Sequence, residues 1–146
     1  MSELRDAEPA AAYESGQIVA ERDYQVTREN LIRYAGASGD FNPIHWSDRV
    51  ATGMGMPGVI AHGMLTMALA GRLLTDWLGD PALIVEYGVR FSRPVVVPDD
   101  DKGVTVSVSA TVTEVRDDGT VGVSIDVVAD DQKVLTQAKA AVRVPS

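Results

Sequence analysis

The feature that most constrains the fold is a long apolar segment, residues 63–78, that has helical length. Its hydrophobic side chains cover most faces of a helix rather than one stripe, and Gly79-Asp80-Pro81 gives a clear stop signal after it. A helix that is apolar on most faces has to be buried inside the protein. The apolar side chains of this segment are Met64, Leu65, Met67, Ala68, Leu69, Leu73, Leu74, Trp77 and Leu78.

The segment that follows this helix has the pattern of antiparallel strands. A strand is predicted over residues 83–91, and from Val104 to Thr113 apolar and polar residues alternate strictly. Asp117-Asp118-Gly119 predicts a hairpin turn, after which residues 121–127 repeat the alternation and residues 133–144 return as a last strand. Such strands have one buried face.

A buried helix and a sheet with one apolar face predict an α+β fold in which the antiparallel sheet wraps the long central helix. Upstream, residues 18–26 form a weak strand candidate, and Thr27 is placed to cap a helix over residues 28–37. Glycines and prolines predict a folded loop over residues 38–59, with one helical turn after Ser47. A single wrapped layer leaves a sheet edge open, so we expect a dimer.

Composition excludes several classes of function. The 146 residues fit one domain, and the absence of cysteine excludes disulfides and thiolate chemistry and fits a cytoplasmic protein. The net charge of −8 argues against nucleic-acid binding, and no apolar run is long enough to span a membrane. Residues 1–14 carry acids and are expected to form a flexible lead-in to a domain over residues 15–146.

Both histidines of the chain lie in the middle region, and the first follows an aspartate in Ser38-Gly39-Asp40-Phe41-Asn42-Pro43-Ile44-His45. Pro43 prevents a regular helix here, so a rigid turn can bring Asp40 and His45 together. A carboxylate beside an imidazole suits proton transfer near neutral pH. Spacing alone leaves open that this pair only stabilises the loop, and that Asn42 serves an Asx turn instead of a ligand.

The start of the long helix is the second candidate position. The backbone N–H of Gly63 is unpaired within the helix, lies at the positive end of its dipole, and is not shielded by a side chain. It could bind a developing oxyanion, and an acyl chain could then run along Met64. From the residues alone, His62 is interpreted as structural because it begins a buried helix, and Gly63 and the methionines are most simply explained by packing. Scattered cations could form an anion patch or a solvated surface: Arg33, Arg72, Arg90, Arg93 and Lys102.

Two motifs resemble a known family. The segment from Tyr34 to His45, followed by Ala51, is similar to the signature of the MaoC-like (R)-specific enoyl hydratases, and Ile60-Ala61-His62-Gly63-Met64-Leu65 resembles the helix start of that family. More narrowly, Gly-Asp-Phe-Asn-Pro-Ile-His-Trp and Val-Glu-Tyr-Gly-Val-Arg-Phe look like the catalytic β subunit of actinobacterial (3R)-hydroxyacyl-carrier-protein dehydratases.

The resemblance implies a hotdog fold and reversible dehydration of (R)-3-hydroxyacyl thioesters of coenzyme A or acyl carrier protein. It implies that Asp40 and His45 exchange protons with the reacting water, that the Gly63 amide polarises the thioester carbonyl, and that Asn42 braces the loop. It also implies no metal or other cofactor, and a homodimer or a heterodimer with a related hotdog subunit.

Three rival functions remain at this stage. A non-catalytic acyl-thioester-binding subunit would have no need of the combined Asp40, Asn42 and His45. A hotdog thioesterase would release free thiol without hydrating an enoyl group. A calcium loop would need a glycine and a final bidentate glutamate at offsets where this chain has neither.

Overall fold

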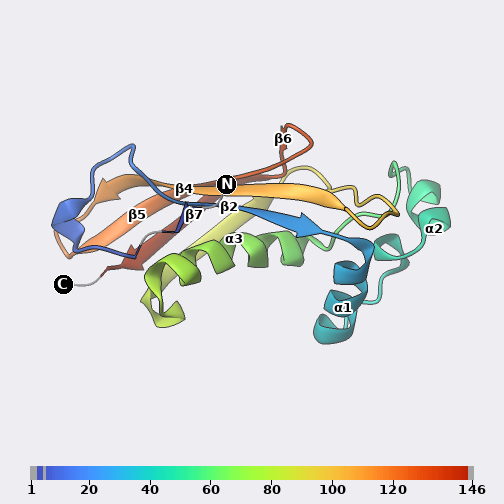
Figure 1. The fold of residues 1–146 in the computed structure, drawn as a ribbon, viewed down its shortest axis with the longest axis horizontal. Coiled ribbons are helices and arrows are strands. Elements are labelled where there is room, and N and C mark those ends of the chain that lie inside the picture. The colour runs from blue at the N-terminus through green and yellow to red at the C-terminus, as the bar shows by residue number, and fades with distance from the viewer. Residues whose placement is uncertain (1–2, 5, 145–146) are drawn as a thin grey trace.

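The predicted α+β architecture is confirmed by the computed structural model, which describes residues 3–4 and 6–144. Figure 1 shows the antiparallel sheet lying across one side of the long helix α3 (Gly63–Leu78), with the shorter helix α1 (Arg28–Ser38) beyond the end of the sheet. The strands are β1 (Glu3–Leu4), β2 (Ile18–Val26), β3 (Ile84–Phe91), β4 (Val104–Val115), β5 (Thr120–Ala129), β6 (Gln132–Lys133) and β7 (Leu135–Arg143). The remaining elements are the helix α2 (Asp48–Gly53) and single 3-10 turns η1 (Ala10–Ala12), η2 (Pro43–His45) and η3 (Pro81–Leu83).

The strands follow the order β1-β2-β4-β5-β7-β3, with β6 paired to β5, and their pairings are antiparallel. The helix α3 is packed against β2, β4 and β3, so it lies against one face of the sheet. Among residues 3–4 and 6–144, β3 has a strand neighbour on one side only, and this leaves it as an edge of the sheet.

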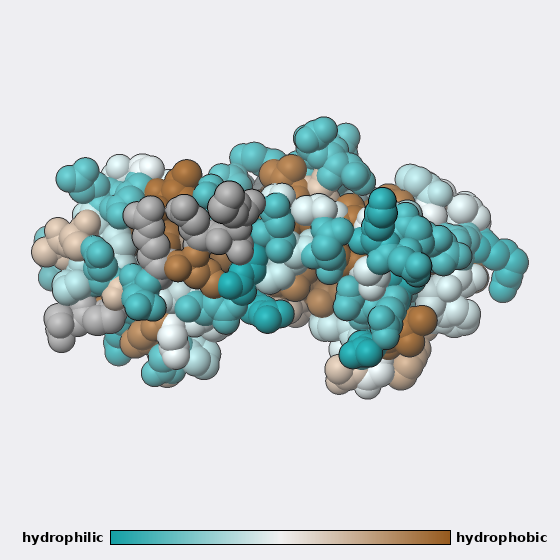
Figure 2. All heavy atoms as spheres, viewed as in Figure 1, coloured by the Kyte–Doolittle hydropathy of each residue, from teal (hydrophilic) through white to brown (hydrophobic). Residues whose placement is uncertain are grey.

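The core lies between α3 and the sheet, where the predicted alternation holds. In β4, Val106 and Val112 are buried while Thr105 and Thr113 on the opposite face are exposed. Leu73 and Leu74 of α3 are fully buried against this surface. In the view of Figure 2, polar side chains cover most of the outside and apolar patches show between them.

Helix ends follow the sequence signals. The Thr27 side chain accepts a hydrogen bond from the N–H of Asn30 and caps α1, and Ser47 caps α2 in the same way from Val50. Gly39 and Gly79 end α1 and α3 in the left-handed conformation, with φ of 78° at each. Because these caps are local, the predicted helix starts agree with the structure.

Two strand predictions were wrong in detail. The strand predicted from residue 83 begins at Ile84, because Asp80 accepts a hydrogen bond from the N–H of Ala82 and holds Pro81–Leu83 in a 3-10 turn. The strand predicted over residues 133–144 is interrupted after β6, and β7 starts at Leu135. Positive φ angles at Asp130 and Asp131 make the tight turn that joins β5 to β6, and the chain bends at Val134 before it continues as β7.

The predicted flexible lead-in lies partly outside the described residues, at positions 1–2 and 5. The part that the structure describes is packed on the domain. β1 pairs with β2, and Tyr13 is buried with its ring edge against Trp77 at a centroid distance of 5.9 Å. Tyr13 was expected to lie in the flexible lead-in. Its ring is instead part of the core, at the C-terminal end of α3.

Candidate active site

The loop that follows α1 brings Asp40 towards His45 through a series of short-range hydrogen bonds. Asp40 Oδ1 accepts from the N–H of Asn42 at 3.1 Å, and Asn42 Oδ1 accepts from the N–H of Ile44 at 3.2 Å. Two consecutive Asx turns therefore lead into the 3-10 turn η2, which starts at Pro43. The Asn42 side chain braces the loop and is engaged with the backbone.

Asp40 and His45 face each other across a short gap, with Asp40 Oδ2 3.9 Å from His45 Nε2. His45 is buried, whereas half of the Asp40 side chain is exposed. The gap exceeds direct hydrogen-bond length, and a water about 2.8 Å from each atom could bridge them. His45 Nδ1 lies 2.7 Å from the carbonyl oxygen of Ile60. Because a carbonyl only accepts, Nδ1 carries the proton in neutral His45 and Nε2 presents its lone pair to this gap.

A cavity of about 260 Å³ opens beside His45 and reaches the start of α3. Gly63 and Thr66 of α3 line this cavity, together with Phe91 at the end of β3. The Phe91 ring is so close to Gly63 that a β-carbon added there would lie 3.1 Å from it. The remaining lining residues are Ile60, Ala61, Ser92, Arg93, Pro94, Val95, Val134 and Leu135.

Three of the five predicted site residues therefore lie at this cavity or its edge: His45 and Gly63 line it, and Asp40 faces His45. Met64 is 57% exposed and lies outside the lining formed by the described residues. It follows Gly63 on the helix, and a step of one residue turns its side chain about 100° around the axis. The Asn42 side chain is exposed, and it supports the site by accepting a hydrogen bond from the backbone N–H of Ile44.

Sequence reasoning missed three residues at this site. Phe91 and Thr66 line the cavity, and the buried ring of His62 stacks on His45 with centroids 3.9 Å apart. His62 was interpreted as structural because it precedes a buried helix. The available signal was that the chain has only two histidines and that both lie between Asp40 and Gly63.

Within the part of the chain that the structure describes, the five candidate cations do not gather into one patch, which agrees with the alternative of a solvated surface. Arg33 pairs with Glu29 and Arg72 lies 3.7 Å from Asp76, both one helical turn away. Of the five candidate cations, Arg93 alone lines the site cavity among the described residues, and Arg90 lines a separate depression of about 530 Å³ over β3 and β7. That larger depression contains no histidine.

Asp40, His45 and His62 each offer a possible metal-ligand atom, and these atoms lie within 4.8 Å of one another. The two imidazoles are stacked with an interplanar angle of 22°. Their nitrogen lone pairs lie in the ring planes, so nearly parallel rings direct them side by side instead of towards one ion. The donor set is therefore poorly arranged for chelation, and its geometry suits proton transfer better.

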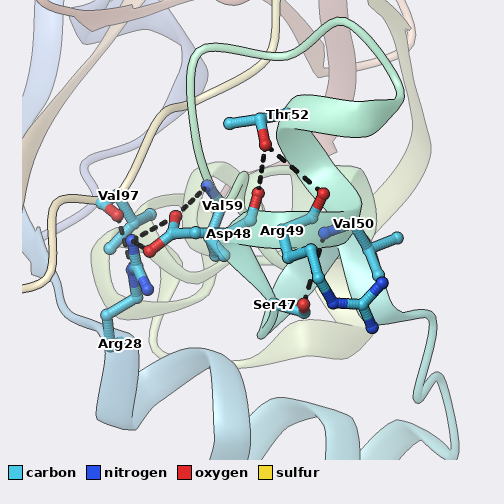
Figure 3. Close-up of polar contacts among 8 residues, drawn as sticks. All are labelled: Arg28, Ser47, Asp48, Arg49, Val50, Thr52, Val59 and Val97. Carbon is cyan, nitrogen blue, oxygen red and sulfur yellow. Dashed lines mark hydrogen bonds and ion pairs between the residues drawn. The ribbon is translucent and has the colours of Figure 1, made fainter.

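The loop beyond His45 is anchored by Asp48, as Figure 3 shows. Asp48 Oδ1 accepts from the N–H of Val59 at 3.0 Å and from Arg28 at 3.0 Å, and Arg28 Nε donates to the carbonyl oxygen of Val97. These bonds connect α1, α2 and the segment before α3. The hydrogen bond from Val59, followed by the Arg28 guanidinium, lowers the pKa of Asp48.

Replacing Asp48 by Asn should lower the thermal midpoint at neutral pH, because the ion pair is lost and the loop is held less firmly. A carboxylate with a lowered folded-state pKa stabilises above its unfolded pKa of about 4, and this stabilisation is lost as the pH falls through the folded pKa. The melting temperatures of Asp48→Asn and the wild type should therefore converge in acid. Asp101→Asn makes the same charge change at an exposed residue and controls for net charge. A constant gap at all pH values would contradict this role.

Comparison with known proteins identifies the family. Residues 11–129 match the MaoC like domain, so the chain belongs to the MaoC-like domain family. The structure superimposes on a MaoC-like dehydratase with a TM-score of 0.90 at 31% identity, over 97% of this chain and 44% of the other. It also superimposes on the (R)-hydratase from A. caviae involved in PHA biosynthesis, with a TM-score of 0.79 at 26% identity, over 92% and 98% of the two chains. The predicted hotdog fold and the family resemblance are both confirmed.

Sequence relatives are similar over shorter regions. The chain is 40% identical over 74 residues to 3-hydroxyacyl-thioester dehydratase X of Mycobacterium tuberculosis, which is 51% of this chain and 25% of that protein. The similarity to dehydratase Y of the same organism is 40% over 72 residues, again 25% of the relative. The matched region thus spans a quarter of these relatives.

Among the described residues, no helix is long and apolar enough to cross a membrane.

Proposed function

We propose that this chain is a hydro-lyase that interconverts (R)-3-hydroxyacyl and trans-2-enoyl thioesters of coenzyme A or acyl carrier protein. The observation that carries the proposal is the gap between Asp40 Oδ2 and His45 Nε2, which opens beside a cavity leading to the N-terminus of α3. The names of the similar proteins, which are dehydratases and (R)-hydratases, support the same chemistry.

In the proposed dehydration, the neutral His45 Nε2 removes the proton from carbon 2 of the substrate. The C–H electrons form the double bond to carbon 3, whose bond to oxygen breaks, and Asp40 supplies the proton that converts the departing hydroxyl to water. Hydration reverses each transfer. The pair shares one transferable proton, which is on Asp40 before dehydration and on His45 before hydration.

The Gly63 amide has the role of oxyanion donor in this proposal. Removal of the carbon 2 proton builds negative charge on the thioester oxygen, and the first amides of a helix lack intrahelical acceptors and lie at the positive end of its dipole. Gly63 lines the cavity, and the Phe91 ring lies close beside it. Since 53% of Phe91 is exposed, its ring can move aside when the thioester enters.

Gly63→Ala tests this role. The new methyl group would lie 3.1 Å from the Phe91 ring and would crowd the amide, so we expect kcat/KM for enoyl hydration to fall about tenfold or more while the protein still folds. Gly36→Ala is the matched control, because it also lies in a helix and its β-carbon would meet nothing within 4 Å. Unchanged kcat/KM in Gly63→Ala would mean that the Gly63 amide does not bind the thioester oxygen.

The assay of the unmodified protein separates this function from its rivals. Incubated with crotonyl-CoA and with a longer trans-2-enoyl-CoA, the protein should consume the enoyl absorbance without releasing free thiol. Release of thiol would indicate a thioesterase. Loss of neither enoyl group nor thiol, with the thioester bound, would indicate a non-catalytic binding subunit.

We also propose that the chain works as a cytoplasmic dimer, with itself or with a related hotdog subunit. The open edge at β3 supports a partner, because an unpaired strand edge is a template for association. A solved structure with the same fold is described as the ChsH1-ChsH2 complex. Native mass spectrometry of the chain alone should give the mass of two copies if the chain pairs with itself. A monomer in this experiment would mean that the dimer forms with the related hotdog subunit or does not form.

A further inference from the structure

The surroundings of His62 indicate a role beyond packing. Its ring is 1% exposed and stacks on His45, while the ring of Tyr34 approaches it edge-on at a centroid distance of 4.8 Å. His62 Nε2 lies 3.0 Å from the backbone oxygen of Asp40. One buried imidazole therefore contacts both residues of the proposed acid–base pair, and it also immediately precedes Gly63.

We propose that His62 is a positioning residue: a neutral imidazole that holds the Asp40 backbone with one nitrogen and the His45 ring with its face. This inference rests on the proposed function, because the two groups that it positions are the proposed acid and base. It assigns to His62 no contact with the substrate.

The hydrogen-bond pattern determines which nitrogen carries the proton. The Asp40 carbonyl oxygen only accepts, so Nε2 of His62 is the protonated nitrogen. Nδ1 is buried and has no hydrogen-bond partner among the described residues. A second proton would bury an N–H without an acceptor and place a charge against the stacked ring of His45. Burial lowers the pKa of His62 and outweighs the hydrogen bond to the Asp40 carbonyl, which raises it. His45 adds a smaller lowering effect and the Asp40 carboxylate a still smaller raising one.

The hydrogen bond to Asp40 and the stacking on His45 constrain different parts of the site. The bond to the Asp40 carbonyl determines where the loop after Gly39 lies, and the stacking fixes the plane in which His45 Nε2 points. The other constraints on the pair are the His45 bond to Ile60 and the turn bonds within the loop. Without His62, the separation of 3.9 Å between Asp40 Oδ2 and His45 Nε2 would be free to widen.

Three substitutions separate the two contacts. His62→Gln retains a donor near the Nε2 position without the ring, His62→Phe retains a ring without the donor, and His62→Ala loses both. Because a displacement of about 1 Å can cost on the order of 100-fold in rate, we expect kcat to fall about 100-fold in His62→Ala and about tenfold in each of the other two, with KM changed less than about threefold. The partial rescue by Gln, which restores the donor without the ring, is the result that a general packing role would not produce.

The kinetic outcomes are read against thermal unfolding of the same variants. If kcat follows the melting temperature and His62→Gln is no better than His62→Ala, His62 is a packing residue and the proposal is overturned. Wild-type kcat in His62→Ala, or a loss confined to KM, would also overturn it.

A measurement on the wild-type protein does not depend on folding of any variant. The chain has only two histidines, so the long-range ¹H–¹⁵N spectrum of its imidazoles contains two ring systems. We expect His62 as the Nε2–H tautomer, and we expect it to take up a second proton at lower pH than an ordinary imidazole, whose pKa is about 6.5. The Nδ1–H tautomer, or protonation at or above that ordinary pKa, would overturn the proposal. If enoyl hydration is absent while these spectra are as expected, the proposed function fails and the geometry of His62 stands.

Discussion

Asp40→Asn should abolish most of the enoyl hydration, lowering kcat by about 10²–10⁴ while the protein remains folded. Asparagine retains an oxygen that can accept the hydrogen bond from the N–H of Asn42, so the loop is expected to keep its shape. It cannot take up and release the proton that the reaction moves. The measurement is the steady-state rate on crotonyl-CoA, with Asp101→Asn as an exposed acid-to-amide control away from the cavity.

His45→Ala should cost a similar factor, and the double variant should lose little more than either single one. Groups that act together on one reacting centre have effects that are far from additive. Near wild-type turnover in folded Asp40→Asn or His45→Ala would count decisively against the assignment. Fully multiplicative losses would mean that the two residues act independently and share no water.

Leu31→Ala should lower the free energy of unfolding by about 2–5 kcal/mol, because it deletes a fully buried side chain that joins α1 to the core. Ile32 is its neighbour on the same helix, is 63% exposed, and serves as the matched control. Ile32→Ala should stay within about 0.5 kcal/mol of the wild type. Urea denaturation at constant slope measures both values. Equal losses for the two variants would contradict the packing of α1 described above.

Leu31 and Ile32 also show how far sequence reasoning reaches. The helix predicted over residues 28–37 contains the large or apolar side chains Leu31, Ile32, Tyr34 and Ala35, and of these the structure buries Leu31 and Ala35. These two lie four residues apart, on one helical face, while Ile32 lies about 100° away from Leu31. Periodicity predicts that a helix exists and where it is capped, but the face that is buried depends on what packs against it.

Some residues of the candidate site could also be predicted from the sequence, and others could not. Asp40, Asn42 and His45 lie within six residues, so local turn chemistry together with the family signature is enough to predict their grouping. Phe91 reaches Gly63 from a strand that follows α3, and this depends on how the sheet wraps the helix. The stacking of His62 on His45 depends equally on the position of the loop against the helix start. Tertiary contacts of this kind leave no periodic or local signal.

The most direct test of shared proton transfer by Asp40 and His45 is hydration of crotonyl-CoA in D₂O, followed by NMR of the product. The wild-type protein should give (R)-3-hydroxybutyryl-CoA with a single deuterium at carbon 2, on one face only, and neither Asp40→Asn nor His45→Ala should form this product at a comparable rate. Product of mixed configuration, or deuterated equally on both faces, would mean that protons come from bulk solvent and that the pair does not carry the reaction.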